Sequence, residues 1–262
     1  MKDFSEKAAA VEPERQPQAM GDVLRDVTAT RYLGNDYGQA NPTWDVEDAP
    51  WKVEQVVRML QRHQIAPTSI AEIGCGAGAI LAGLRGYFPD AALYGFDIAP
   101  GAAGLWSRHA SARIEFTLGD FFQRSHRRYD LLLVLDVIEH LANPFDFLSR
   151  LRGHAEHSLF HIPLDLSAVS VLREQPLLHA RAKVGHLHYY TKGLALTMLK
   201  EAGHHVVDSC YTGAGFTAPR RGWLGKIASL PRRIVQAIAK DAGVRLLGGE
   251  TLMILTRHGE MP

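Results

Sequence analysis

The sequence predicts an α/β fold in which helices cover both faces of a parallel sheet. Five short, almost continuously apolar runs predict the strands: residues 69–73, 92–97, 113–117, 130–135 and 157–162. Stretches with helical spacing separate these runs, and strands that alternate with single helices indicate βαβ crossovers. Apolar residues at nearly every strand position indicate burial on both faces. With 46% hydrophobic and 22% charged residues, the chain has the composition of a folded domain, which excludes disorder throughout.

The predicted helices follow from apolar spacing and from residues that begin helices. Asp48 can cap a helix that has Pro50 in its first turn and an apolar stripe running to about His63. Further helices are expected near residues 78–88, 100–110, 143–153 and 191–202. The last third adds expected strands at 204–211 and 250–256, separated by a basic, partly amphipathic segment.

Composition excludes several classes of protein. The chain has 29 Lys and Arg against 28 Asp and Glu, a net charge of +1, which does not favour nucleic-acid binding. Two cysteines, Cys75 and Cys210, cannot build a disulfide framework or a zinc ribbon. No stretch approaches the roughly 20 apolar residues of a membrane span, so a cytoplasmic protein is expected. The 13 histidines raise the question of metal binding or acid-base chemistry.

Two regions are expected along the chain. Residues 1–49 form an N-terminal arm and an aromatic loop, and residues 50–262 form the main domain with a basic amphipathic insert at 212–246. Tyr37, Trp44 and Trp51 lie just before or within the first predicted helix, where an aromatic loop can close over a ligand as a lid. The alternative is an aromatic clamp that only covers the sheet edge.

A glycine-rich turn at residues 72–78, Glu-Ile-Gly-Cys-Gly-Ala-Gly, is the strongest local signal. It follows a predicted strand and opens a predicted helix. Glycines let the backbone turn sharply close to a ligand, and free N–H groups at the helix start can receive an anion. Taken alone, the pattern also fits a plain strand-to-helix turn.

Acidic residues follow each of the next three predicted strands. Asp97 ends the second strand, about 20 residues after the first glycine, where open α/β sheets place an acid that accepts hydrogen bonds from ribose hydroxyls. Asp120 follows the third strand, and Asp136 and Glu139 follow the fourth. Singly, Asp97 could be a helix cap, Asp120 a turn residue and Glu139 a solvated charge. Together, strand ends on one edge of the sheet favour a ligand site.

These motifs resemble the class I S-adenosylmethionine-dependent methyltransferases. The resemblance runs through EIGCGAG, YGFD, LGDF and YDLLLVLDVIEHLANP over residues 69–162. The segment GHLHYYTKGLALTMLKEAGH at 185–204 is similar to the late segment of small-molecule members. The resemblance implies a Rossmann-like, doubly wound, seven-stranded sheet, mostly parallel, with an antiparallel last strand at ETLMILTR. It also implies S-adenosylmethionine as the cofactor.

The resemblance assigns a role to each motif residue. Gly74, Gly76 and Gly78 would line the methionine part of the cofactor, with Glu72 near its ammonium through water, Asp136 and Val137 beside the methionine, Asp97 on the ribose, Asp120 on the adenine amino group, and Ile98 and Phe121 packed on the ring. Cys75 in the glycine turn and Trp51 in the aromatic loop complete the predicted cofactor contacts.

The implied reaction is an in-line displacement at an activated sulfonium methyl, and it needs mainly alignment. The acceptor is expected to offer an oxygen or nitrogen of a small-molecule or glycan-type compound. His140 is the first candidate for a general base, with His161 and His186 as further candidates. His140 could instead bind the backbone at a helix start, and His161 could be a satisfied buried histidine. Only one of His186 and His188 can face the pocket, because they alternate along an extended segment.

Other functions also fit parts of the sequence. Glu139, His140 and a later histidine, with Asp136 at the position of the first acid, resemble the magnesium set of small-RNA 2′-O-methyltransferases, but similar text occurs in metal-free small-molecule enzymes and no metal is expected. A nicotinamide-dependent oxidoreductase is disfavoured by the G-x-G-x-G spacing. A non-catalytic, cofactor-binding subunit is the third alternative.

Residues 220–240 could contact an anionic membrane or a lipid-linked acceptor, or simply be a solvated face. The acceptor and the oligomeric state stay open.

Overall fold

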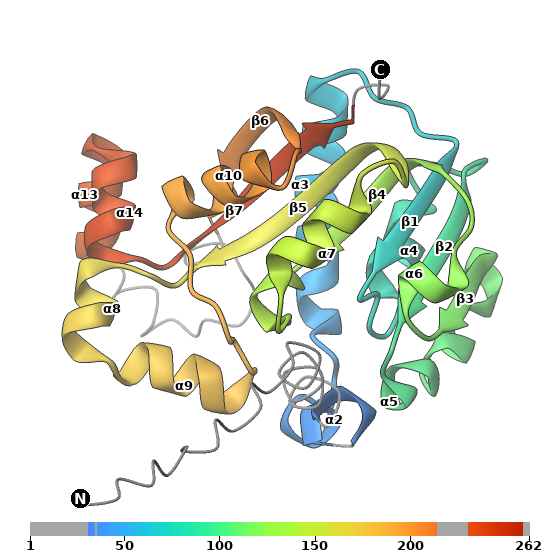
Figure 1. Cartoon of the computed structure of the whole chain (residues 1–262), viewed down its shortest axis with the longest axis horizontal. Helices are drawn as coiled ribbons and strands as arrows, with labels where there is room; N and C mark the ends of the chain where they lie inside the picture. The colour runs from blue at the N-terminus through green and yellow to red at the C-terminus, as the bar shows by residue number, and fades with distance from the viewer. Residues whose placement is uncertain (1–30, 35, 214–229, 259–262) are drawn as a thin grey trace, which may run out of the picture.

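The computed structural model describes residues 31–34, 36–213 and 230–258. Its centre is a seven-stranded sheet with the strand order β3-β2-β1-β4-β5-β7-β6 (Figure 1). The strands are β1 (Ser69–Ile73), β2 (Ala92–Asp97), β3 (Ile114–Leu118), β4 (Tyr129–Leu135), β5 (Ala155–Leu164), β6 (His205–Tyr211) and β7 (Glu250–Arg257). β1 to β5 pair in parallel, and β7 runs antiparallel to both β5 and β6. The predicted doubly wound sheet with an antiparallel last strand is confirmed.

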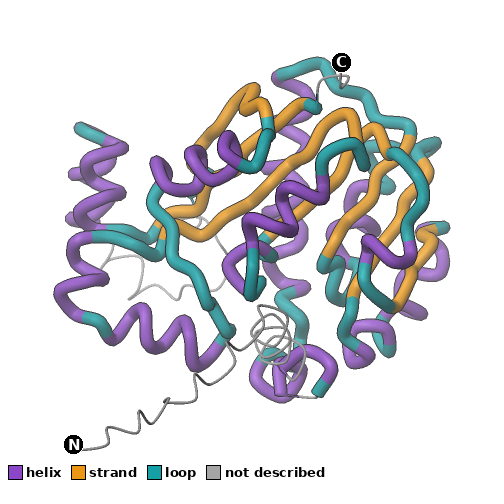
Figure 2. Tube along the Cα trace, viewed as in Figure 1, coloured by secondary structure: helices purple, strands orange, loops and turns teal. Residues whose placement is uncertain are grey.

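Helices cover both faces of the sheet, as the apolar strands predicted. One core contains side chains of α3 (Ala49–Arg62) and α4 (Ala79–Leu84) packed on one face. The other core contains side chains of α7 (Pro144–Leu151), α10 (Lys192–Glu201) and α14 (Lys240–Leu247). In Figures 1 and 2, α7 and α10 lie in front of the sheet and α3 lies behind it. Because both faces are covered, ligands can approach the central strands only at their ends.

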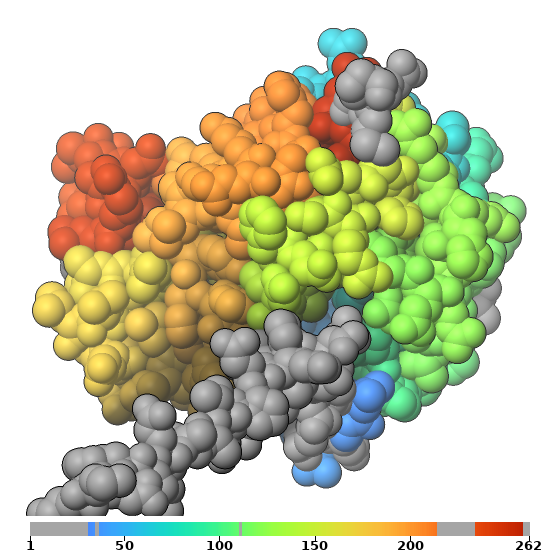
Figure 3. Space-filling model, viewed as in Figure 1, coloured from blue at the N-terminus to red at the C-terminus, as the bar shows by residue number. Residues whose placement is uncertain are grey.

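The remaining helices are short and connect or flank these elements. They are α2 (Asp36–Ala40), η1 (Val46–Asp48), α5 (Pro100–Ala103), η2 (Trp106–Ala112), α6 (Phe121–Arg124), η3 (Ile138–His140), α8 (Ala168–Arg173), α9 (Gln175–Lys183) and α13 (Leu230–Ile238). The pair α8 and α9 projects beside α13 and α14 at one end of the molecule (Figures 1 and 3). Among the described residues, no helix has the length and apolar character needed to cross a membrane.

Two predicted helices are shorter than the sequence indicated. The helix expected at 100–110 is wrong as a continuous element, because α5 ends at Ala103 and a 3₁₀ segment follows. There, Trp106 stacks on Phe116 with ring centroids 4.9 Å apart and donates from Nε1 to the Gly76 carbonyl at 2.8 Å. The helix expected at 78–88 ends at Leu84, after which Arg85 donates to several loop carbonyls. Tertiary contacts therefore override the local helical preference at both places.

Candidate active site

A cavity of about 550 Å³ lies at the edge of the sheet formed by the carboxyl ends of β1, β2 and β4. The loop that follows β3 also lines it. Of the residues predicted to bind the cofactor, the cavity is lined by Trp51, Glu72, Gly74, Cys75, Gly76, Asp97, Ile98, Asp120, Phe121, Asp136 and Val137. The candidate bases His140, His161 and His186 also line it. The strand topology thus brings residues from distant parts of the chain to one place. Gly78 is the exception among the described candidates, since it is absent from the lining.

Glycine is needed in the turn after β1 for two different reasons. Gly74 has φ +72°, and a Cβ there would lie 2.7 Å from Cγ2 of Val137, so the turn can pass the β4 loop only without a side chain. Gly78 has φ +81°, and its Cβ would lie 2.4 Å from the Phe116 ring. Gly78 therefore allows the turn to pack on β3, whereas Gly74 and Gly76 face the cavity.

Two of the strand-end acids also satisfy nearby backbone groups. The Asp97 carboxylate accepts hydrogen bonds from the amides of Gly76 and Ala99, each at 2.8 Å. Burial raises the pKa of Asp97, and these amide bonds oppose the shift. Asp120 accepts from the Phe122 amide at 2.7 Å and so caps α6. The helix-cap alternative for Asp97 is wrong, because the N-cap of α5 is Ala99, and Asp120 is a helix cap where a turn residue was the alternative; both side chains line the cavity.

Glu72 carries a buried carboxyl group that lacks a full set of hydrogen-bond partners among the described residues. It is 2% exposed, and among the described residues its Oε2 has no hydrogen-bond partner. Burial raises its pKa to about 8; the charge of Lys52 lowers the pKa, and that of Asp97 raises it. The carboxyl is therefore largely protonated at neutral pH and would ionise if a cation entered the cavity.

Side chains from α3, β5 and the turn after β4 bind one another on the cavity wall. Asp136 has φ +55°, and its carboxylate binds Lys52 Nζ at 2.6 Å and His161 Nδ1 at 2.7 Å. Burial alone would raise the pKa of Asp136, but His161 and Lys52 together lower it far below its usual range. Burial also opposes the charge of Lys52, yet the contact with Asp136 raises its pKa overall. Trp51 packs edge-on against His161 at 5.8 Å.

Lys52 was missed by the sequence reasoning. Its only signal is position, because it lies four residues before the buried Val56 on the same side of α3. A lysine on that stripe needs an acidic partner, and the partner comes from β4, far along the chain.

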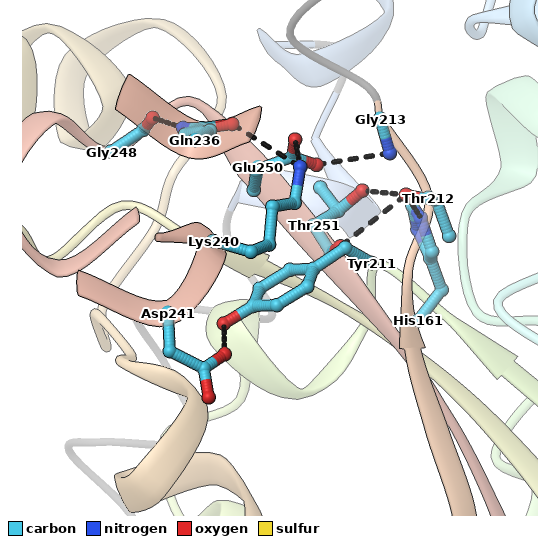
Figure 4. A network of polar contacts seen from close by, with 10 residues as sticks. All are labelled: His161, Tyr211, Thr212, Gly213, Gln236, Lys240, Asp241, Gly248, Glu250 and Thr251. Carbon is cyan, nitrogen blue, oxygen red and sulfur yellow. Dashed lines mark hydrogen bonds and ion pairs between the residues drawn. The ribbon is translucent and has the colours of Figure 1, made fainter. Parts of the chain in front are cut away.

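Behind the cavity, His161 connects to a second polar network (Figure 4). Its Nε2 lies 3.3 Å from Oγ1 of Thr212, whose hydroxyl contacts that of Thr251. Both ring nitrogens of His161 therefore have side-chain partners, as expected of a satisfied buried histidine. At the far end of the network, Lys240 forms an ion pair with the buried Glu250.

This pairing bears on the basic segment at 220–240. The Lys240 side chain is 40% exposed, but its ammonium group is paired with Glu250, which offsets its positive charge in any basic patch on this segment. On α13 of the same segment, Ile234 is 54% exposed, so one of its apolar side chains does face solvent. Residues 220–229, with Arg220, Arg221 and Lys226, lie outside the described residues, so the proposed membrane contact remains a prediction.

The other candidate histidines meet Glu139 at the opposite side of the cavity. Glu139 is 0% exposed, so its interpretation as a solvated charge is wrong. The amides of Leu187 and His188 donate to the Glu139 carbonyl at 2.7 and 3.1 Å, which anchors the 185–190 segment on η3. His186 lines the cavity, and His188 is not among its described lining residues, as the alternation predicted.

Burial governs the electrostatics of this group. It raises the pKa of Glu139 well above its usual range, and the charge of Asp136 adds to the shift. Burial and then His186 lower the pKa of His140 to about 4. The rings of His140 and His186 are 4.9 Å apart, and His186 Nδ1 bonds to Asp165 Oδ2 at 2.6 Å. His140 is thus a neutral imidazole at physiological pH.

Aromatic side chains cover the cavity from the N-terminal side. Tyr32, Tyr37 and Trp44 form a row with centroid separations of 5.0 and 5.1 Å, and all three line the cavity. Tyr32 also packs edge-on against His140 at 5.9 Å. Arg31 donates to the carbonyls of Ala182 and Lys183 at 2.9 Å, which ties this segment to the end of α9. The three rings therefore belong to the cavity wall, and closure of this segment as a lid stays a prediction.

Comparison with known proteins agrees with this architecture. Residues 71–157 match the family model described as a methyltransferase domain. No curated protein sequence matches the chain. Magnesium protoporphyrin IX methyltransferase (ChlM) from Synechocystis PCC 6803, solved with SAH, is similar with a TM-score of 0.55 and 15% identity, covering 80% of this chain and 83% of that one.

The plantazolicin methyltransferase BpumL, solved with a pentazolic desmethylPZN analog and SAH, is similar with a TM-score of 0.58 and 18% identity. The match covers 92% of this chain and 98% of that one. These structural likenesses show the fold. Together with the family-model match, they confirm the predicted resemblance to class I methyltransferases.

Proposed function

We propose that this chain, whose residues 71–157 match a methyltransferase domain, binds S-adenosylmethionine in the cavity and transfers its methyl group to an acceptor. The acceptor is a small-molecule or glycan-type compound that offers an oxygen or nitrogen. The two similar structures contain SAH, the demethylated form of this cofactor. A cavity of about 550 Å³ falls within the range of small-molecule sites, roughly 300–1,000 Å³.

The charge of the cavity wall is the observation that carries this proposal. Its acids are Asp45, Asp48, Asp97, Asp120, Asp136 and Asp146, together with Glu72 and Glu139, whose pKa values burial raises, against the bases Lys52, Arg150 and three histidines. Such a wall favours a ligand with positive charge, and S-adenosylmethionine carries a sulfonium and an ammonium. A dinucleotide would bring a pyrophosphate into the same acidic surroundings. The wall therefore supports the methyltransferase over the nicotinamide-dependent alternative.

Three acids of the cavity wall each fit one part of this cofactor. Glu72 would meet the ammonium, which supplies the positive charge that its unpartnered oxygen lacks. Asp97 accepts two amide bonds, and a carboxylate has further lone pairs for the ribose hydroxyls. Asp120, Ile98 and Phe121 would surround the adenine.

The cofactor supplies a methyl group on a sulfonium, a leaving group that needs no acid. The protein has to hold the acceptor in line with the C–S bond and keep water away. The aromatic row of Tyr32, Tyr37 and Trp44 lines the cavity and would exclude water. His140 is unprotonated at neutral pH, so it can accept the proton of an acceptor hydroxyl as the new C–O bond forms. His161, held by Asp136 and Thr212, acts as a positioning residue.

Thermal shift and calorimetry with S-adenosylmethionine, SAH and NADH test the cofactor assignment. Both sulfur compounds should raise the melting temperature and NADH should not. Stabilisation by NADH alone would reject the proposal. Transfer of labelled methyl groups from the cofactor into small-molecule extracts tests catalysis. Tight cofactor binding without any transfer would favour the non-catalytic alternative.

A further inference from the structure

We propose that Glu139, His140 and His186 bind a divalent first-row transition-metal ion, which holds and activates a hydroxyl oxygen of the acceptor. One potential ligand atom from each residue lies within 4.8 Å of the others. The three residues come from two segments, η3 and the loop before α10, which backbone hydrogen bonds hold together. This inference departs from the metal-free expectation and rests on the proposed methyltransferase function for its use of the acceptor.

The distances suit a metal ion. Bonds of about 2.0–2.2 Å from imidazole nitrogen and carboxylate oxygen place ligand atoms roughly 3–4.4 Å apart. His140 Nε2 lies 3.8 Å from Glu139 Oε1, inside that range. The widest separation allowed by the 4.8 Å limit needs a contraction of only a few tenths of an ångström. Rotation of a side chain can supply that movement without a change in the backbone.

Glu139 provides independent evidence of a cationic ligand. Its side chain is 0% exposed, and within the described part of the chain neither carboxylate oxygen has a hydrogen-bond partner. A buried carboxyl group without partners is costly, and its ionised form is stable there only if it is paired or coordinates a metal. The nearby lysine, Lys52, is already bound to Asp136 at 2.6 Å. A metal ion between the two histidines would supply the missing positive charge.

His186 is oriented in the way that metal-binding histidines usually are. Its Nδ1 bonds to Asp165 Oδ2 at 2.6 Å, which leaves Nε2 as the ring nitrogen available to a metal. A carboxylate behind a ligating imidazole fixes the ring and its tautomer. Asp165 therefore positions a ligand and is not a ligand itself.

The ligand set and its location indicate the kind of ion and the kind of acceptor. Two imidazoles with one carboxylate favour Mn²⁺, Fe²⁺, Co²⁺ or Zn²⁺ over Ca²⁺ and Mg²⁺, which prefer oxygen ligands. All three residues line the cavity, so coordination positions remain for a ligand there. An acceptor hydroxyl bound to the metal gives up its proton to solvent more readily. Its oxygen then attacks the methyl carbon, the C–O bond forms, and the C–S bond breaks to leave a neutral thioether.

In this arrangement the metal replaces His140 as the means of activating the hydroxyl. The acceptor is then a hydroxylated compound, and methylation falls on oxygen. A nitrogen acceptor would gain little, because an amine nucleophile needs no metal-assisted loss of a proton.

Titration of the chelator-treated full-length protein with Co²⁺, followed by visible absorption and calorimetry, tests the site without any cofactor. The wild-type protein should bind one equivalent. Glu139→Gln and His186→Ala should each weaken binding at least about 100-fold, and Asp165→Asn about 10–100-fold. His188→Gln is the matched control, since this neighbouring histidine is outside the cavity lining, and it should bind as the wild type does.

Affinity for S-adenosylmethionine, measured on the same proteins, separates the two proposals. Absence of saturable Co²⁺ binding to the wild type would overturn the metal site and leave the cofactor assignment standing. Wild-type affinity for Co²⁺ in Glu139→Gln would also overturn it. If one variant fails to fold, as judged by circular dichroism, the other variant decides the outcome.

Discussion

Binding of S-adenosylmethionine should release a proton from Glu72 at neutral pH. The carboxyl has a pKa of about 8 in the cofactor-free protein because it is buried. The ammonium that we place beside it would stabilise the ionised form, and the pKa would return toward its ordinary range. Cofactor binding and the ionisation of Glu72 are then linked, and the linkage can be measured directly.

The size of the effect follows from two titrating groups. At pH 7, a group with a pKa of about 8 is about nine-tenths protonated, whereas an ordinary α-amino group is about one-tenth unprotonated. Binding should therefore release about 0.8 proton at pH 7. At pH 9 the proportions reverse, and binding should take up about 0.8 proton. Affinity should consequently be greatest near pH 8.

Isothermal titration calorimetry in buffers of different ionisation enthalpy measures this proton count. Glu72→Gln, which keeps the size of the side chain, serves as the control and should lose the release at pH 7. A wild-type value near zero at pH 7 would refute the reasoning. So would the same release in Glu72→Gln, because another group would then be the source.

Three further predictions concern residues around the cavity. Glu72→Gln should flatten the pH dependence of the free energy of unfolding. Because the pKa of Glu72 is raised, the folded wild type binds more protons than the unfolded chain, and its stability falls from about pH 4.5 to about pH 8. Urea unfolding of both proteins across that range would show the difference. Asp97→Ala should weaken S-adenosylmethionine binding about 30-fold or more, from roughly 2 kcal/mol of lost charge-assisted hydrogen bonding, and unchanged affinity in calorimetry would contradict its assignment. Lys52→Met should lower the free energy of unfolding by about 3 kcal/mol because it leaves Asp136 with only His161, and Lys52→Met combined with Asp136→Asn should recover part of that loss in denaturant titrations.

The sheet could be predicted because each of its strands is a short apolar run that can be recognised within a local stretch of sequence. β1 and β2 match the predicted ranges residue for residue, since each apolar run stops at a residue that changes the backbone or begins the site. The pair α8 and α9 could not be predicted in this way. All of α9 is described and none of its residues is buried, so no apolar stripe exists for a sequence pattern to reveal.

The site was predictable where topology alone determines position. Residues that follow parallel strands meet at one edge, which places Asp97, Asp120 and Asp136 together without any knowledge of packing. Burial was not predictable. The exposure of Glu139 depends on the 185–190 segment that folds over η3, and the role of Lys52 depends on an acid from another element. Both features arise from long-range contacts that a local sequence window does not contain.

Four acids that line the cavity, Glu72, Asp97, Asp136 and Glu139, separate into two kinds. Asp97 is satisfied by backbone amides, and Asp136 by Lys52 and His161, so these two carboxylates stabilise the walls before any ligand arrives. In Glu72, by contrast, one carboxyl oxygen has no hydrogen-bond partner among the described residues, and in Glu139 neither oxygen has one.

Natural proteins rarely retain such groups without a use, because each costs free energy in the empty state. The two acids therefore mark two separate positions for positive charge, one for the ammonium of the cofactor and one for a metal ion. Glu72→Gln should then impair cofactor binding while Co²⁺ affinity is kept, and Glu139→Gln should do the reverse. Loss of both affinities in either variant would show that the two carboxylates serve a single site.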